Sequence, residues 1–221
     1  MISKEDFENY LCQIENKQLG YILDKVKDIP GDIVELGVWT GNNAIEFMWQ
    51  SKEKKYYGFD TFNGYTEEDI DGSPNKDDLR ENNTGRWGPW EEWNGIEDTK
   101  KRLEQFKSRV FENTGYNISD FELVKGDLKK TLPQYVEENK IKQISLLYID
   151  CNVYPAALHG IESAWPAMTE GSVICIDEHK EGGETKAIKE IAEKYNLSVE
   201  YTGFKFESGP HSNPSKYIIK K

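Results

Sequence analysis

The chain has 221 residues, 37% of them hydrophobic and 31% charged, and carries a formal net charge of −12. This length is enough to bury one substantial core, which predicts a single domain over residues 1–221. The acidic balance would repel a phosphate backbone, which excludes nucleic acid as an expected partner, and no stretch is long and apolar enough to span a membrane.

Residues 1–28 form the first predicted element. From about residue 3 onward, apolar positions recur with a period near 3.6, which predicts one or two amphipathic helices. The sequence IPGD at 29–32 ends this helical segment, because proline restricts the residue before it and glycine permits a tight turn.

After this turn the pattern alternates between strands and helices. Short apolar runs predict strands at 32–37, 55–60, 121–127, 143–150 and 172–178. The segments between them predict helices at about 42–51, 97–113, 131–139, 156–166 and 184–195. Strands buried on both faces and separated by helices indicate parallel βαβ units.

The last two predicted strands, at 198–204 and 216–221, have no helix between them. Their connection is rich in turn residues, which predicts an antiparallel hairpin. The expected fold class is therefore α/β: a doubly wound, Rossmann-like, seven-stranded and mostly parallel sheet with one antiparallel edge strand and helices on both faces.

Residues 63–96 interrupt this alternation, because they show no apolar periodicity. A long loop without regular structure is typical of a lid, a binding loop or a disordered segment. Trp87, Trp90 and Trp93 argue against disorder, since each would bury a large apolar area. We expect an inserted lid that covers an acceptor, and packing within the loop or against a second subunit is the alternative.

The three cysteines, Cys12, Cys151 and Cys175, lack the spacing of a metal or redox motif. Two of them stand in or next to apolar strand runs. This usage predicts buried thiols in a reducing compartment, without a disulfide framework or a zinc site. Because the N-terminus also lacks the apolar core of a signal peptide, we expect a cytoplasmic protein.

The first predicted strand ends in the sequence ELGVWTG. Gly37 and Gly41 would let the backbone turn tightly and approach a ligand, and the helix that follows would offer free amides. A turn without a ligand is the alternative. Trp39 fills the middle of the motif, so the three-glycine dinucleotide fingerprint is absent, which counts against an NAD-dependent oxidoreductase.

Further acids end the next two predicted strands. Asp60 follows Gly37 by 23 residues, close to the separation at which an acid reaches a nucleoside ribose. The third strand ends in Gly126 and Asp127, where an acid or its neighbouring amides could meet an adenine edge. Clustered carboxylates would repel a pyrophosphate and attract a sulfonium cation, which favours S-adenosylmethionine as the ligand. Solvated or helix-capping acids are the alternative.

The fourth and fifth predicted strands end in Asp150 and in the pair Asp177 and Glu178. Ends of adjacent parallel strands lie within about 5–10 Å, so these three carboxylates should converge. Like charges that close require a proton or a cation between them. Oxygen ligands, with His179 as the nearby nitrogen donor, favour Mg²⁺ or Ca²⁺ over zinc, whereas unrelated helix caps are the alternative.

Over about residues 29–195 the chain resembles the macrocin O-methyltransferase (TylF-like) family. The resemblance is carried by the segments IPGDIVELGVWTGNNAIEF, YYGFDTFNGY, FELVKGDLKKTLP, LLYIDCNVYPAALHGIESAWPAMTEGSVICIDEH and GGETKAIKEI. Trp39 itself belongs to the family's E-x-G-V-W-x-G form. The resemblance implies a class I methyltransferase fold and an S-adenosylmethionine- and Mg²⁺-dependent O-methyltransferase. Its expected partner is a small molecule with a sugar hydroxyl, and the chain could form a homo-oligomer.

The resemblance also implies roles for individual residues. Glu35, Gly37 and Gly41 would surround the methionine part of the cofactor, Asp60 would lie at the ribose and Asp127 near the adenine. The full implied cofactor set is Glu35, Gly37, Val38, Trp39, Gly41, Asp60, Thr61, Gly126 and Asp127. The implied metal ligands are Asp150, Asp177 and Glu178, the last of these replacing a more common aspartate.

One departure from the family concerns the general base. The family commonly reads D-G-D at the end of the fourth strand, whereas this chain reads Asp150, Cys151 and Asn152, and Asn152 cannot accept a proton. Val153 stands where related catechol-type enzymes have a lysine. Either His179 takes the proton or the metal acidifies the hydroxyl, so the catalytic candidates are His179, Asn152 and Asp150. The alternative function is a module that binds S-adenosylmethionine without catalysis.

Overall fold

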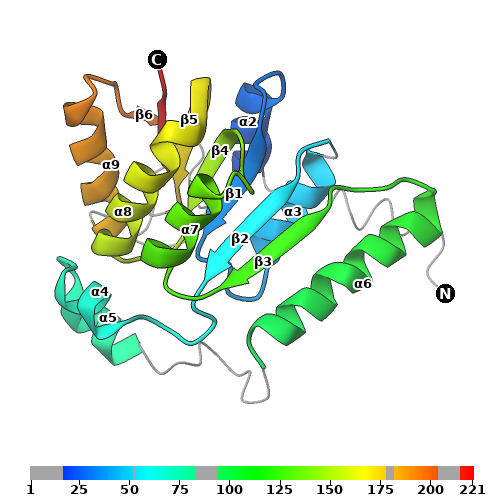
Figure 1. The fold of residues 1–221 in the computed structure, drawn as a ribbon, viewed down its shortest axis with the longest axis horizontal. Helices are drawn as coiled ribbons and strands as arrows, with labels where there is room; N and C mark the ends of the chain where they lie inside the picture. Colours follow the sequence, from blue (N-terminus) through cyan, green and yellow to red (C-terminus); the bar gives the residue numbers. More distant parts are fainter. Residues whose placement is uncertain (1–16, 52, 83–93, 178–181, 204–214) are drawn as a thin grey trace.

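The computed structural model describes residues 17–51, 53–82, 94–177, 182–203 and 215–221 (Figure 1). The helices are α2 (Lys17–Val26), α3 (Asn42–Gln50), α4 (Glu67–Asp71), α5 (Lys76–Asn82), α6 (Ile96–Thr114), α7 (Leu128–Glu137), α8 (Tyr154–Ala164), the 3₁₀ helix η1 (Trp165–Ala167) and α9 (Gly183–Lys194). The strands are β1 (Asp32–Leu36), β2 (Tyr56–Asp60), β3 (Phe121–Lys125), β4 (Ile144–Ile149), β5 (Met168–Ile176), β6 (Glu200–Tyr201) and β7 (Lys216–Ile219).

The strands form one sheet in the order β3-β2-β1-β4-β5-β7-β6. Strands β1 to β5 run parallel, and β7 runs antiparallel to both β5 and β6. The predicted doubly wound α/β class and the final hairpin are therefore confirmed. The reversed strand was expected at the edge, but β7 lies one place inside it. The buried KYII sequence of β7 pairs with β5, and the exposed EY of β6 takes the edge.

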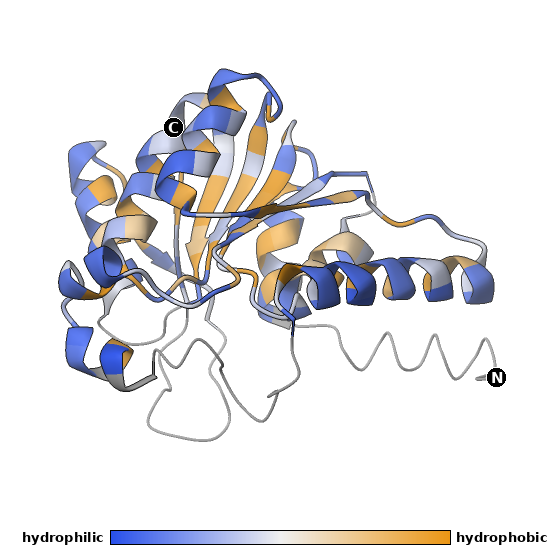
Figure 2. Ribbon diagram, turned by 60° about the horizontal axis from the view of Figure 1, so that its bottom comes forward, coloured by the Kyte–Doolittle hydropathy of each residue, from blue (hydrophilic) through white to orange (hydrophobic). Residues whose placement is uncertain are grey.

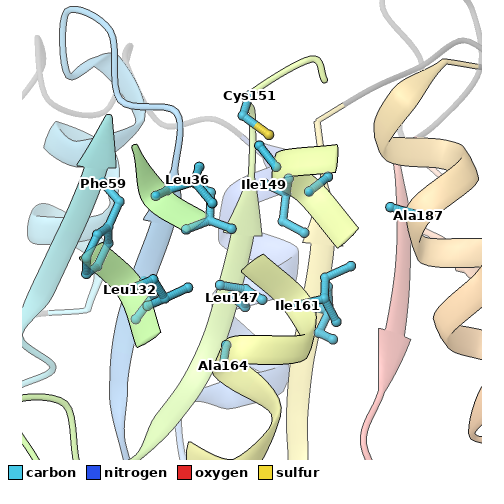
Figure 3. Packing of buried hydrophobic residues seen from close by; sticks show 14 of the residues in the cluster. Leu36, Phe59, Leu132, Leu147, Ile149, Cys151, Ile161, Ala164 and Ala187 are labelled. Atoms are coloured by element: carbon cyan, nitrogen blue, oxygen red, sulfur yellow. The ribbon is translucent and has the colours of Figure 1, made fainter. Parts of the chain in front are cut away.

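Helices cover both faces of the sheet, so the protein has two cores. One core lies under α7, α8 and α9, and Figure 3 shows side chains of α7 and α8 packed on those of β1, β2 and β4. The other core lies under α2, α3 and α6. Successive residues of β4 alternate between the cores: Leu147 and Ile149 face the first, and Leu146 and Tyr148 face the second. Figure 2 shows the hydrophobic residues concentrated on the sheet and on the helix sides toward it.

Three expectations about local structure need correction. The segment 63–96 contains α4 and α5, which form because Thr66 caps α4 by accepting from Asp69 N and because Ile70 and Leu79 are buried in the first core. Helix α7 begins at residue 128, earlier than predicted, because Asp127 caps it. Strand β3 is only partly buried, since it lies at the other edge of the sheet.

Several expectations fall on residues outside the described ranges: Cys12, the first part of the N-terminal helical segment and the three tryptophans Trp87, Trp90 and Trp93. Cys151 and Cys175 are buried and free, as predicted. Within the described ranges, none of the helices has the length and apolar character needed to cross a membrane.

Candidate active site

A cavity of about 390 Å³ lies where the carboxyl ends of β1, β2, β4 and β5 meet the loops that follow them. The predicted site residues that line it are Gly37, Val38, Trp39, Asp60, Thr61, Asp127, Asp150, Asn152 and Asp177. Glu35, Gly41 and Gly126 do not line it. Glu178 and His179 lie outside the described residues. Most of the described candidates therefore line one cavity, and their roles stay predictions.

Gly37 lies where the carboxyl ends of β1, β2 and β4 meet. Its N–H donates to Phe59 O at 2.9 Å, and Asp150 N donates to Leu36 O at 2.8 Å. With φ of +90°, Gly37 adopts a conformation that side chains disfavour, and a Cβ here would lie 2.1 Å from Asp150 O. A glycine is therefore required for β1 and the end of β4 to approach this closely.

Asp60 organises the turn after β1. Its Oδ2 accepts from Val38 N at 2.7 Å and Trp39 N at 2.8 Å, and its Oδ1 accepts from Phe62 N at 2.6 Å. Trp39 has φ of 49°, in the left-handed region, and two hydrogen bonds at its ends hold this conformation. Asp60 thus shapes the cavity wall, and its contact with a ribose stays a prediction.

Helix α6 supports the same turn from outside the sheet. Thr99 Oγ1 donates to Trp39 O at 2.9 Å, and Arg102 donates to Thr40 O at 3.0 Å. A Cβ at Gly41 would lie 3.1 Å from the Thr99 side chain and 3.2 Å from that of Leu103. The absence of a side chain at Gly41 therefore lets α6 pack closely against this turn.

Glu35 is fully buried behind the cavity wall. The Tyr56 hydroxyl donates to its Oε2, and Asn43 Nδ2 donates to its Oε1 at 3.0 Å. Burial raises the pKa of Glu35 to about 8. The side chain that lines the cavity at this place is Asn43, which sequence reasoning missed. Its only signal is a polar residue in the first helical turn after the glycine motif.

Asp150 and Asp177 stand at neighbouring strand ends, where Asp177 N donates to Ile149 O at 2.8 Å. Asp150 Oδ2 accepts from Asn43 at 3.0 Å, and Asp177 Oδ1 accepts from the buried Tyr148 hydroxyl at 2.7 Å. Burial, followed by the charge of Asp177, raises the pKa of Asp150 well above its usual range. Such a pair favours a shared proton or a cation.

The pair fits a hard cation chemically, since both residues offer carboxylate oxygen to the same cavity. In the described part of the chain, however, no three His, Cys, Asp or Glu side chains lie close enough together to hold a metal ion. The third predicted ligand, Glu178, falls outside that part. The metal site therefore remains a prediction.

Asn152 is exposed, lines the cavity and has φ of 62°. Its backbone N–H donates to Glu184 Oε1 at 2.6 Å, and Glu184 is only 1% exposed. Gly183 allows this contact, because a Cβ there would lie 3.1 Å from Asn152 O and closer still to Tyr154 N. Sequence reasoning missed Glu184, since acids are common in the first turn of exposed helices as well.

The inserted segment contributes the wall beside Asp127. Asp127 accepts from Lys129 N at 3.1 Å, and Lys129 Nζ lies 2.7 Å from the buried Asp69 of α4. Tyr65 also lines the cavity, and burial first, then nearby charges, raises its pKa above the usual value. Neither Tyr65 nor Asp69 was predicted, although the spacing of Thr66 and Asp69 is a helix-start signal.

The family model of macrocin-O-methyltransferase (TylF) matches residues 17–202. Among curated proteins, the chain is similar to the 8-demethyl-8-(2,3-dimethoxy-alpha-L-rhamnosyl)-tetracenomycin-C 4'-O-methyltransferase of Streptomyces olivaceus. The two are 24% identical over 176 residues, which cover 77% of this chain and 61% of that protein. The chain therefore spans less than two thirds of the length of this relative.

Three solved structures illustrate the fold. The calicheamicin methyltransferase CalS11 has a TM-score of 0.66 at 22% identity, covering 99% of this chain and 80% of that chain. The O-methyltransferase NovP has a TM-score of 0.67 at 18% identity, covering 93% and 78%. An O-methyltransferase from Bacillus cereus in complex with SAH has a TM-score of 0.56 at 13% identity, covering 92% and 80%. These likenesses establish the shared methyltransferase fold.

Proposed function

Because the chain belongs to the macrocin-O-methyltransferase (TylF) family, we propose that it is an S-adenosylmethionine-dependent O-methyltransferase acting on a hydroxyl of a sugar or a glycosylated small molecule. The observation that carries this proposal is the cavity bounded by the Gly37 turn and by Asp60, Asp150 and Asp177. The Streptomyces relative is named for methylation of a rhamnosyl group, and CalS11 is described as a TDP-rhamnose 3'-O-methyltransferase. A rhamnose-like deoxyhexose is therefore the first acceptor class to test.

Donor binding is assigned to the carboxyl ends of β1, β2 and β3. The Gly37 turn would receive the methionine part, Asp60 and Thr61 the ribose, and Asp127 the adenine. When bound, S-adenosylmethionine would supply a methyl group on a positively charged sulfur, which the acids around the cavity would favour. The fixed turn supports this assignment, because Asp60 and α6 hold its backbone before any ligand arrives.

We assign Asp150, Asp177 and Glu178 to a divalent metal, Mg²⁺ or another hard ion. The raised pKa of Asp150 supports this assignment, since a cation would relieve the repulsion that Asp177 exerts on it. Bound there, the ion would orient neighbouring hydroxyls of the acceptor and lower their pKa.

The remaining task of the chain is to position the acceptor and to remove its proton. Holding the reacting groups at near-attack distance corresponds to effective molarities of about 10⁵ M or more. Asn152 can hydrogen-bond an acceptor hydroxyl but cannot take its proton, and the raised pKa of Tyr65 keeps its hydroxyl neutral. His179 is therefore our candidate for the general base.

Methyl transfer from labelled S-adenosylmethionine to a panel of rhamnosides and other sugars with vicinal hydroxyls tests this function. We expect transfer in Mg²⁺ that stops with a chelator and resumes when Mg²⁺ is restored. Asp177→Asn should lose transfer yet still bind S-adenosylhomocysteine. If the product binds and no acceptor is methylated, the chain is a cofactor-binding module. If S-adenosylhomocysteine does not bind, the methyltransferase assignment is wrong.

A further inference from the structure

Asn43 stands in the first turn of α3 and lines the cavity between acids from two neighbouring strands. Its Nδ2 donates to Glu35 Oε1 and to Asp150 Oδ2, at 3.0 Å each. A side-chain amide has two N–H bonds, so both are used. In this orientation of the amide, Glu35 Oε1 and Asp150 Oδ2 are both acceptors, so any proton on either acid lies on its other oxygen.

The remaining polar atom of Asn43 is its carbonyl oxygen, Oδ1. Within the described ranges no donor reaches this atom, and it is not one of the buried polar atoms that lack a partner. An amide is planar, so an NH₂ group that points to the two acids leaves the carbonyl directed elsewhere. Asn43 lines the cavity, and Oδ1 is therefore an acceptor that a ligand can reach.

The surroundings of this acceptor select the charge of its ligand. Asp150 lines the same cavity, and Glu35 lies directly behind the amide. An acceptor oxygen beside carboxylates disfavours an anion and suits a group that carries both positive charge and N–H donors. An ammonium group has these properties, whereas a sulfonium has the charge but no N–H to donate.

We infer that Asn43 Oδ1 binds the ammonium group at the amino-acid end of the methyl donor, while the Asn43 NH₂ group holds Glu35 and Asp150 in place. This inference rests on the proposed function and adds a donor-binding residue to it. Asn43 thereby connects the donor end of the cavity to Asp150, which we assign to the metal. A purely structural Asn43 would make the same two bonds to the acids but would not distinguish ligands with and without an amino group.

A ligand pair that differs only in the amino group tests this distinction. Isothermal titration calorimetry on the full chain would measure binding of S-adenosylhomocysteine and of its deaminated analogue, in which hydrogen replaces the amino group. We expect the wild type to bind S-adenosylhomocysteine about tenfold or more tightly than the analogue. Asn43→Ala should lose most of this preference, chiefly through weaker binding of S-adenosylhomocysteine, and Asn113→Ala, which removes an exposed amide on α6, should keep it.

An equal loss for both ligands in Asn43→Ala, or no loss for either, would overturn the inference while leaving the methyltransferase assignment intact. A wild-type chain that binds neither ligand would overturn both. Thermal unfolding and binding of the analogue report whether the variant is folded. Should Asn43→Ala fail to fold, Asn43→Leu, which fills a similar volume without a polar atom, gives the same comparison.

Discussion

Replacement of Asp60 by asparagine tests whether this carboxylate holds the cavity wall. Asp60 accepts three backbone N–H groups, two at Oδ2 from Val38 and Trp39 and one at Oδ1 from Phe62. An amide of the same shape keeps only one acceptor oxygen. Its best placement preserves the two bonds at Oδ2 and turns an NH₂ group toward Phe62 N, so that two donors face each other.

The expected cost follows from these contacts. A hydrogen bond to a charged acceptor contributes about 1.5–3 kcal/mol, and an amide left without an acceptor costs about 1–3 kcal/mol when buried. Because the two remaining bonds also lose the negative charge of their acceptor, Asp60→Asn should lower the free energy of unfolding by about 2–3 kcal/mol. Asp60→Ala, which removes all three bonds, should lower it further.

Urea unfolding followed by circular dichroism measures this change, provided that the dependence of the unfolding free energy on urea is the same in each variant. Asp24→Asn is the matched control. Asp24 pairs with Lys27 at 2.8 Å with 72% of its side chain exposed, so its replacement should leave the stability close to that of the wild type. If Asp60→Asn is as stable as this control, Asp60 does not hold the turn and our account of the cavity wall is wrong.

Three further predictions test other parts of the site. Gly37→Ala should lose about 3 kcal/mol or more in thermal unfolding, because its φ of +90° is strained for a side chain and the new Cβ would meet Asp150 O at 2.1 Å; an unchanged midpoint would contradict the packing. Burial raises the pKa of Glu35 from 4.5 to about 8, so the folded chain keeps a proton that the unfolded chain releases, and stability should fall as the pH rises from about 4.5 to 8. Urea unfolding between pH 5 and 8 should show this fall in the wild type and a flatter profile in Glu35→Gln, and equal profiles would argue against a buried acid. Lys129→Met should cost about 3 kcal/mol, because it leaves Asp69 buried without its cation, whereas Lys130→Met, at an exposed side chain, should change stability by less than about 1 kcal/mol. Similar losses in the two lysine variants would show that the pair with Asp69 is not special.

The sheet could be predicted from sequence because its strands carry a strong local signal. The run ISLLYI of β4 is buried at every position, and only a central strand between two helical layers suits such a run. The place of β7 could not be predicted in the same way. Which of two hairpin strands pairs with β5 depends on how much apolar surface each buries, and that comparison involves a distant part of the chain.

In the candidate site, too, residues placed by local sequence signals could be predicted, whereas residues placed by long-range packing could not. Acids at strand ends, such as Asp60 and Asp150, could be assigned to one rim because strand order alone brings them there. Asn43 and Glu184 could not, because their contacts with Asp150 and Asn152 depend on how α3 and α9 pack against the sheet. The α4–α5 segment was missed for a third reason: each helix buries too few apolar side chains to produce a helical period.

The inner position of β7 also bears on self-association through the sheet. It leaves β6, with two exposed residues, as the outermost strand on that side. A strand this short offers few unpaired N–H and C=O groups to an approaching chain. Among the described residues, this side of the sheet therefore ends on a border that offers little for strand addition by another molecule.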